Sequence, residues 1–297
     1  MVPLLVLCNF IFLGYWLVQR HRYLWFPAVV LVVGYFFLGT FFKFRLSESP
    51  IAKEDISVMT FNARTFNKIG LFKDKTIGQQ IVDLVRSEDP DIVCFQEFEY
   101  QRSKGKDFDG YKYSYVNRQS GKVVQAIYSK FPIVGKGSID FPDSANNAIF
   151  ADVVIQKDTV RVYNLHLESH RIIPNIRRIS KEPKAKLVKR MGRSFAKQQE
   201  QALLLEAHRD ACPYKKIICG DLNNTQFSNV YRQVKGDMRD SFLEEGTGYG
   251  RTYNFKYYPV RIDFILVDKS FEVRAHKNYG AKLSDHFPVM ASFKMDP

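Results

Sequence analysis

The stretch KIICGDLNNT, residues 216–225, decides the fold. Its apolar run predicts a buried strand, and Gly220 permits a sharp exit from that strand. Asp221 and Asn223 follow two residues apart, a spacing that points both side chains the same way in an extended chain. Polar side chains at the ends of apolar strands are typical of the rim where α/β enzymes build their sites. We therefore expect an α/β domain with a site at this strand end.

Two earlier strands end in the same way. The run ISVMTFN ends on Asn62, and DIVCFQE ends on Glu97. A carboxylate in this position can bind Mg²⁺, which prefers oxygen ligands. For either residue alone, a capped strand end or a salt bridge is the better explanation. The candidates therefore count only as a set, which comprises Asn62, Glu97, His166, Asp221, Asn223, Asp263, Asp285 and His286.

Two of the later motifs place charged residues among apolar ones. In RIDFILV, Asp263 lies between apolar neighbours, where an unpaired carboxylate would be costly, so it requires a metal, a cation or a histidine. In SDHFPVM, Asp285 precedes His286, and a carboxylate can tune an imidazole beside it. A Ser-Asp turn before the next strand explains the second motif equally well.

Strand-like runs recur throughout the chain after residue 55, and their number implies two packed sheets. Helical periodicity appears at residues 76–87 and 184–210. The polar segment 46–55 is expected to link the N-terminal region to a single catalytic domain at 56–297. The predicted strands cover residues 56–61, 91–95, 111–117, 123–128, 148–155, 160–166, 216–219, 261–267 and 287–293.

The N-terminus contains two uncharged apolar runs, residues 2–18 and 24–42, separated by QRHRY. Each is close to the roughly 20 residues that a helix needs to cross a bilayer, so residues 1–45 are predicted to form a transmembrane hairpin. A signal peptide is disfavoured because the basic first region is missing. A pair of buried soluble helices is disfavoured because neither run has a polar face.

Basic residues beside the two runs bear on their orientation. Arg20 and Arg22 in the connection would stay in the cytoplasm under the positive-inside rule, which places the catalytic domain on the outer side. Lys43 and Arg45 argue for the opposite orientation. We expect a multi-pass membrane protein whose domain lies outside the cytoplasm.

The chain is basic, with a formal net charge of +13. A basic domain favours anionic partners such as nucleic acid, phosphorylated metabolites or acidic lipids, although a solvated surface without a ligand fits as well. Residues 171–197 carry ten Lys or Arg against one Glu and suggest a phosphate-facing or membrane-facing insertion, or a solvated helix face. The four cysteines have no zinc-site spacing and are not expected to take part in chemistry.

Six motifs, TFN, QE, NLHL, GDLN, RIDFI and SDHFP, occur in an order that resembles the endonuclease/exonuclease/phosphatase superfamily, from about residue 56 to 293. This superfamily includes deoxyribonuclease I, exonuclease III, inositol polyphosphate 5-phosphatases and bacterial sphingomyelinases. The resemblance implies an α/β fold in which two packed, mainly antiparallel β-sheets are flanked by helices in a four-layer sandwich. The N-terminal hairpin is closer to a membrane-anchored bacterial branch, which implies the bacterial inner membrane.

The resemblance also implies roles for the set. Glu97 would be the principal metal ligand, with Asn62 and Asp263 helping to set the metal and the attacking water. Asp221 would orient or deprotonate that water, and Asn223 would donate to a phosphate oxygen. His286, held by Asp285, and His166 on the opposite side would contact the scissile phosphate.

The implied function is hydrolysis of a phosphate ester that depends on Mg²⁺, with Mn²⁺ as a second option. A phosphodiester in a nucleic acid suits the positive charge. A phospholipid or inositide suits the expected membrane hairpin. A non-catalytic binding module tethered to the membrane is the third alternative, and the intact set of site residues argues against it. No protein partner is inferred.

Overall fold

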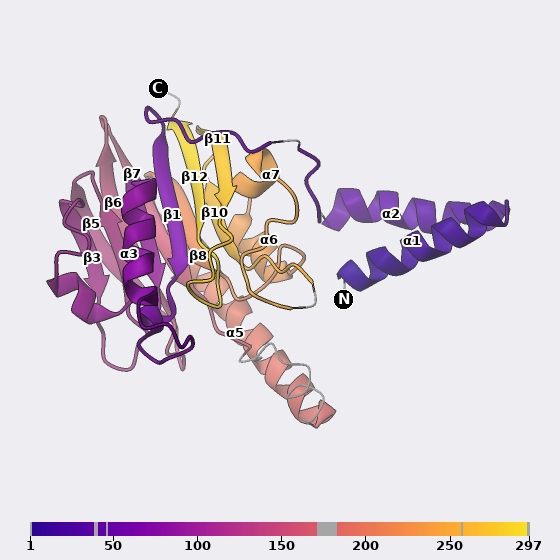
Figure 1. Cartoon of the computed structure of the whole chain (residues 1–297), viewed down its shortest axis with the longest axis horizontal. Coiled ribbons are helices and arrows are strands. Elements are labelled where there is room, and N and C mark those ends of the chain that lie inside the picture. Colours follow the sequence, from indigo (N-terminus) through magenta and orange to yellow (C-terminus); the bar gives the residue numbers. More distant parts are fainter. Residues whose placement is uncertain (1, 39–40, 46, 171–182, 257, 296–297) are drawn as a thin grey trace.

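The computed structural model describes residues 2–38, 41–45, 47–170, 183–256 and 258–295. Two six-stranded sheets pack face to face, and helices lie on their outer faces (Figure 1). All neighbouring strands are antiparallel except one parallel pair in each sheet. The predicted fold of two packed, mainly antiparallel sheets flanked by helices is confirmed.

The first sheet has the order β11-β12-β1-β2-β4-β3, with β1 and β2 as its parallel pair. The second has the order β5-β6-β7-β8-β10-β9, with β7 and β8 parallel. The strands of the first sheet are β1 (Ile56–Asn62), β2 (Ile92–Gln96), β3 (Tyr113–Asn117), β4 (Gln125–Ser129), β11 (Phe271–Asn278) and β12 (Val289–Met295). Those of the second are β5 (Ile133–Asp140), β6 (Asn147–Ile155), β7 (Asp158–His166), β8 (Lys215–Asp221), β9 (Arg239–Asp240) and β10 (Asp263–Val267).

The main core lies between the sheets, where Val, Ile and Phe side chains of both inner faces pack together with Cys94 and Cys219. A polar link crosses this core, because Gln96 Nε2 donates to Asn164 Oδ1 at 2.5 Å. Both side chains are fully buried, and a buried hydrogen bond between the sheets restricts how one sheet lies on the other.

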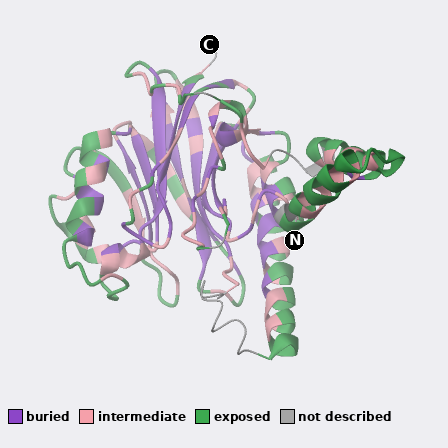
Figure 2. Ribbon diagram, turned by 45° about the vertical axis from the view of Figure 1, so that its right-hand side comes forward, coloured by how far each residue is buried: buried purple, intermediate pink, exposed green. Residues whose placement is uncertain are grey.

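Helices bury the outer faces of both sheets. The helix α3 (Ile77–Glu88) presents an apolar stripe, including Ile81 and Val85, to the first sheet. The second sheet is covered by α6 (Asn229–Lys235) and by the C-terminal half of α5 (Lys184–Asp210), whose purple, buried side faces the strands in Figure 2. The helical segment predicted at 184–210 is α5, whereas residues 171–182 of the basic stretch lie outside the described residues.

Several elements were not predicted. The strands β5 and β11 lie at sheet edges, and β11 alternates buried and exposed residues, so neither forms the continuous apolar run that marks the central strands. The strand β9 and the helices α6 and α7 (Ser241–Glu245) are too short to show a period. Three short 3-10 helices were also missed: η1 (Arg22–Leu24), η2 (Arg64–Asn67) and η3 (Tyr100–Lys104).

The N-terminal helices α1 (Val2–Val18) and α2 (Trp25–Leu38) form a hairpin that projects from the domain (Figure 1). Most of their large apolar side chains, from Leu4 to Phe36, are exposed. The second helix ends well before residue 42, the predicted limit of the run. Among the helices that the structure describes, none is both long and apolar enough to cross a membrane, so the predicted transmembrane spans are not supported.

The segment that follows the hairpin, residues 43–45 and 47–49, forms hydrogen bonds and an ion pair with the catalytic domain. Lys43 and Gly248 exchange backbone hydrogen bonds of 2.8 and 3.0 Å, and Arg45 forms an ion pair with Glu245. Ser49 Oγ donates to the same carboxylate at 3.1 Å. The junction, whose later part falls in the predicted linker, therefore packs along α7 and the turn that follows it.

Candidate active site

The strand register brings the predicted polar residues together at one end of the sheets. Asp221 at the end of β8 lies beside His166 of β7 and Asp263 of β10. Asn62 ends β1 in the other sheet, and Glu97 follows the neighbouring β2. Asn62 Nδ2 donates to Asp221 Oδ2 at 3.1 Å and to Glu97 Oε1 at 3.3 Å, so both sheets contribute to a single cluster.

Gly220 allows β8 to run close to β7 at this point. A Cβ atom at residue 220 would lie 2.2 Å from the backbone oxygen of Leu165, and the φ angle of Gly220 is +128°. The sequence predicted a sharp exit from the strand here. The close approach of two backbones is the stronger reason for glycine, and it sets Asp221 directly beside His166.

Asp221 is the centre of the cluster and is 1% exposed. Its carboxylate accepts hydrogen bonds from Asn62 and from the backbone of Asn223, and the Nε2 atoms of His166 and His286 each lie 3.7 Å away. Burial raises the pKa of Asp221 to about 7, although the charge of His286 opposes that shift. A carboxyl group that titrates near neutral pH can accept a proton during a reaction.

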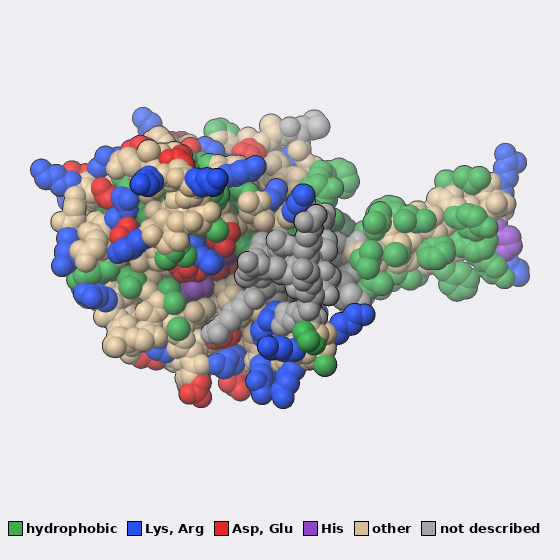
Figure 3. Space-filling model, turned by 60° about the horizontal axis from the view of Figure 1, so that its bottom comes forward, with side chains coloured by type: hydrophobic (Ala, Val, Ile, Leu, Met, Phe, Trp, Pro, Cys, Tyr) green, Lys and Arg blue, Asp and Glu red, His purple; other side chains and the backbone are tan. Residues whose placement is uncertain are grey.

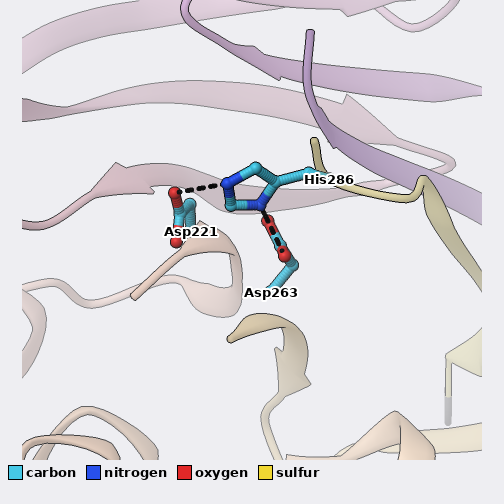
Figure 4. Close-up of side chains that lie close together, drawn as sticks. All are labelled: Asp221, Asp263 and His286. Atoms are coloured by element: carbon cyan, nitrogen blue, oxygen red, sulfur yellow. Dashed lines mark hydrogen bonds and ion pairs between the residues drawn. The ribbon is translucent and has the colours of Figure 1, made fainter. Parts of the chain in front are cut away.

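His286 is held by Asp263 and not by Asp285. Its Nδ1 atom lies 2.9 and 3.1 Å from the two oxygens of Asp263, and its ring directs Nε2 toward Asp221 (Figure 4). Burial would lower the pKa of His286, but the charges of Asp263 and Asp221 outweigh it and raise the pKa to about 10. The imidazole is therefore an imidazolium at neutral pH and can donate from Nε2.

Asp285 does not hold His286 as predicted, although its charge is among those that raise the pKa of His286. Asp285 Oδ2 instead accepts a 3.0 Å hydrogen bond from Arg64 Nη1, and its Oδ1 lies 3.2 Å from Ser284 Oγ. The chain bends at Ser284 and Asp285 before the bridge at His286, and the Asp285 carboxylate is engaged by Arg64 and not by the histidine that follows it. Asp263 was predicted to need a metal, a cation or a histidine beside it, and His286 is that partner.

Glu97 lies at the mouth of the cluster. Its side chain is 21% exposed, and its φ angle of +48° turns the chain out of β2 immediately after the strand ends. The nearest donors are distant, with Asn62 Nδ2 at 3.3 Å, Arg64 Nε at 3.6 Å and His166 Nε2 at 3.9 Å. A carboxylate with such loose contacts keeps lone pairs for a cation, which fits the ligand role expected of it.

The other two predicted ligands are more strongly engaged. Asp263 has both oxygens near His286, and Asn62 Oδ1 accepts from the backbone of Arg64 at 3.2 Å. Among the described residues, the ligand atoms of Asp221, Asp263 and His286 lie within 4.8 Å of one another, although a protonated His286 leaves only the two carboxylates as possible metal ligands. Two buried carboxylates with only one tight basic partner form a donor set that suits a divalent cation.

His166 and Asn223 flank the cluster. Burial lowers the pKa of His166, although the charge of Glu97 opposes that shift, and its Nδ1 atom is buried without a hydrogen-bond partner among the described residues. Asn223 has a φ angle of +50°, and its side-chain amide donates to the backbone oxygen of Leu167 at 2.9 Å. The chain is therefore no longer extended at residue 223, and its side chain does not run parallel to that of Asp221.

Three residues that position the site, Arg64, Thr252 and Tyr253, were not predicted from the sequence. Thr252 Oγ1 accepts from the backbone nitrogens of Ile262 and Asp263 at 2.9 and 3.0 Å, and the Tyr253 ring packs on His286 at 4.9 Å. Arg64, the third, could have been suspected as a cation two residues after the strand end. The other two lie in a loop with no apolar pattern, so no sequence signal pointed to them.

The face that carries the site combines acidic and basic groups. Figure 3 shows red acidic and purple histidine side chains in the middle of this face, with blue Lys and Arg side chains around them. The helix α5 reaches this rim through Gln198, whose Nε2 donates to the backbone oxygens of Glu168 at 2.7 Å and Asn223 at 3.2 Å. Its first half, with exposed Lys186, Lys189 and Arg193, extends beyond the rim.

Comparison with solved structures supports the fold. TDP2 from D. rerio, complexed with single-strand DNA product, has a TM-score of 0.62 and 16% identity over 82% of this chain and 100% of that one. A Bacteroides thetaiotaomicron endonuclease/exonuclease/phosphatase family protein has a TM-score of 0.60 and 20% identity over 82% and 98%. The mannosyl-6-phosphatase of the same species has a TM-score of 0.60 and 19% identity over 81% and 100%.

Family comparisons divide the chain at the junction described above. Residues 1–41 match a domain of unknown function, DUF8431. No curated protein matches the chain. Residues 59–286 match the model of the Endonuclease/Exonuclease/phosphatase family, and this match covers most of the chain and the whole cluster from Asn62 to His286. The chain therefore belongs to the endonuclease/exonuclease/phosphatase family.

Proposed function

We propose that this protein hydrolyses a phosphodiester with the help of a divalent metal ion, Mg²⁺ or Mn²⁺. The observation that carries the proposal is the buried cluster around Asp221, in which an imidazolium, a neutral imidazole and a carboxyl group of pKa about 7 meet. Phosphoester hydrolysis is the activity of the family, and a site with these groups can move a proton and stabilise negative charge.

Glu97 would hold the metal ion, with Asn62 and Asp263 contributing as the family resemblance implies. The loose contacts and partial exposure of Glu97 support this assignment. A bound divalent ion supplies positive charge that stabilises the negative charge developing on phosphate oxygens.

The protein's own groups would perform the remaining steps. Asp221 orients the attacking water and takes its proton, since its pKa lies near neutral pH. His286 donates from Nε2 to a phosphate oxygen, because Asp263 keeps the ring charged and fixes its orientation. His166 lies on the other side of Asp221 and would contact the phosphate from there. Asn223 would take part only if its amide leaves Leu167.

The basic half of α5 favours a polyanionic substrate such as nucleic acid. Lys186, Lys189 and Arg193 are exposed on a helix that starts beyond the rim and packs against the Asn223 loop through Gln198. Cations spaced along such a helix can contact successive phosphates of a strand without reading its sequence. The similar D. rerio TDP2 is described as complexed with single-strand DNA product, which agrees with this choice.

The exposed apolar hairpin favours a second candidate, a lipid or inositide phosphoesterase. A continuous exposed apolar surface, such as that of α1 and α2, usually marks contact with a membrane or with a partner protein. In this alternative the protein works at a membrane surface, and the proposed location is the bacterial inner membrane with the domain outside the cytoplasm.

A substrate panel tests both candidates. The full chain, with Mg²⁺ or with EDTA, is assayed on plasmid DNA, RNA, sphingomyelin vesicles, phosphoinositide vesicles and a small phosphodiester, beside Asp221→Ala. Turnover that requires Mg²⁺ and is lost in the variant supports the proposal, and the preferred substrate selects the candidate. A folded protein that binds Mg²⁺ but turns over none of these substrates would favour a binding module.

A further inference from the structure

Arg64 is placed in the site by an unusual turn. Four successive residues, Arg64 to Asn67, have left-handed φ angles of +44°, +53°, +54° and +64°. Such a conformation costs roughly 1 kcal/mol or more for each residue that is not glycine. A run of this kind persists only where the surroundings enforce it, so the contacts of the turn indicate what it is built to hold.

The turn is fixed at each position. The backbone of Thr65 donates to Glu97 O at 2.7 Å, and that of Arg64 donates to Asn62 Oδ1 at 3.2 Å. The Phe66 ring packs against Phe95 and Phe98, at 5.4 and 5.3 Å. The amide of the fourth residue, at position 67, holds the loop that follows through three hydrogen bonds. The turn thus ties the backbone of Glu97 to the side chain of Asn62 and places the side chain of Arg64 at the rim.

The guanidinium of Arg64 is only partly used. Its Nη1 donates to Asp285 at 3.0 Å, while its Nε atom has no hydrogen-bond partner among the described residues and lies 3.6 Å from Glu97. Arg161 shows the contrasting arrangement, because its Nε and Nη2 donate to both oxygens of Asp152 at 2.6 and 2.8 Å. The Arg161 side chain is 15% exposed and that of Arg64 is 37% exposed. Because the Nε atom is itself buried, the donors that Arg64 can offer to a ligand are those of Nη1 and Nη2, at the end of a side chain that is partly exposed.

Arg64 also differs from the other Lys and Arg side chains that the structure describes in its distance to the site. Of the Lys and Arg side chains in the described ranges, it alone lies within 4.0 Å of a carboxylate of the site. Its positive charge therefore adds to that of His286, on the side of the cluster where Glu97 is partly exposed. A planar guanidinium with free donors matches two oxygens of one phosphate group, which a lysine ammonium cannot do.

We propose that Arg64 is a substrate-binding residue that grips the non-bridging oxygens of the scissile phosphate, with Asp285 holding its guanidinium in place until substrate arrives. This inference rests on the proposed function. On binding, the phosphate takes over the Nη1 donor that Asp285 occupies. Asp285 thus competes with the phosphate for Arg64, and this competition distinguishes the proposal from an ion pair that merely supports the fold.

Binding of inorganic phosphate tests the competition. The full chain in EDTA is titrated calorimetrically with phosphate at pH 7.5, as wild type, Arg64→Gln, Arg64→Lys and Asp285→Asn, with the exposed Arg274→Gln as the matched control. Loss of a charge-assisted bidentate contact should weaken binding about 10–100-fold in Arg64→Gln and less in Arg64→Lys. Asp285→Asn should bind phosphate a few-fold more tightly, and the control should bind as wild type does.

The direction in which each variant changes phosphate affinity distinguishes a substrate-binding role of Arg64 from a structural one. Weakening by Arg64→Gln together with tightening by Asp285→Asn supports the proposal. Equal weakening by both would identify a structural ion pair and overturn it, as would unchanged binding in Arg64→Gln or no binding by the wild type. Phosphate binding through Arg64 without turnover of any ester would overturn the proposed function alone. Turnover with kcat/KM unchanged in Arg64→Gln would overturn this inference alone.

Discussion

The second sheet carries two buried polar clusters, one around Asp240 and one around Asp221. They shift the pKa of their carboxyl groups in opposite directions. Asp240 and Asp221 are each 1% exposed, and both strands that carry them pair with β10. Asp240 accepts two hydrogen bonds from Arg261, at 3.0 and 2.8 Å, and a third from Tyr231 at 2.6 Å. The Arg261 guanidinium is in turn stacked on the ring of Phe264 at 4.5 Å.

The pKa values of the two carboxyl groups record this difference. Burial alone would raise the pKa of Asp240, but the charge of Arg261 outweighs it and holds the pKa below its usual value. Burial raises the pKa of Asp221 to about 7, and the opposing charge of His286 is shared with Asp263. The Asp240 cluster is balanced within the fold, whereas the Asp221 cluster is left short of positive charge. A metal ion, or a proton taken from the attacking water, can compensate this missing positive charge.

The largest effect on stability is expected when the balanced cluster is broken. Asp240→Asn leaves the Arg261 charge buried without its counter-ion, which should lower the free energy of unfolding by about 3–5 kcal/mol. Urea denaturation followed by circular dichroism measures the change. A loss below about 1 kcal/mol would mean that the ion pair contributes little and that the comparison between the clusters fails.

His276 lies beside the Asp240 cluster, with its Nδ1 atom 2.9 Å from Oγ of Ser241, the residue after Asp240. From this histidine we expect a pH dependence of stability. Burial lowers the pKa of His276 from 6.5 to about 4, so the unfolded chain binds its proton first as the pH falls. This contribution to stability is complete above pH 6.5 and is lost between pH 6.5 and 4, with about 2 kcal/mol gone by pH 5. Urea titrations from pH 8 to 4.5 should show this slope in the wild type and a shallower one in His276→Gln. Parallel curves for the two proteins would contradict the prediction.

The charge-deficient cluster should respond in the opposite direction. In metal-free protein at pH 8, Asp221→Asn removes a buried charge that burial disfavours, so the free energy of unfolding should rise by about 1–2 kcal/mol. The same urea assay gives the result, with Asp240→Asn as the matched carboxylate-to-amide change. A variant less stable than the wild type would show that the fold depends on the Asp221 charge.

The smallest expected effect concerns the basic half of α5, outside both clusters. Neutralising Lys186, Lys189 and Arg193 to Gln should reduce kcat/KM on DNA about tenfold at low salt and flatten its salt dependence, because fewer counter-ions are released. Turnover of a small phosphodiester should not change. The control is Lys269→Gln, which follows the end of β10 remote from Asp263. Equal losses on both substrates would place the effect in the fold of α5 and not in polyanion binding.

The sequence was sufficient to identify the strand ends of the cluster. Asn62, Asp221 and Asp263 end or begin buried apolar runs, and such runs have few possible interpretations. The helix at 184–210 was also predicted, because its apolar second half is periodic. Edge strands such as β11 escaped notice because their charged outward positions break the apolar pattern.

The sequence could not show which side chains that are distant along the chain form hydrogen bonds with each other. Asp285 precedes His286 and was therefore expected to hold it, whereas Asp263, 23 residues away, does so because of where β10 begins. The left-handed turn of Arg64 contains no glycine to reveal it. Its conformation is imposed by tertiary contacts, and local residue preferences would not favour it.

The most direct test of the account is the turnover of a phosphodiester by Asp221→Asn in the presence of Mg²⁺, measured on protein shown to be folded. We expect wild-type turnover to require Mg²⁺ and the variant to lose roughly 10²–10⁴-fold in kcat, because a general base has been removed. A variant that keeps wild-type kcat while binding Mg²⁺ would contradict the claim that the uncompensated carboxylate at the centre of the cluster performs the chemistry.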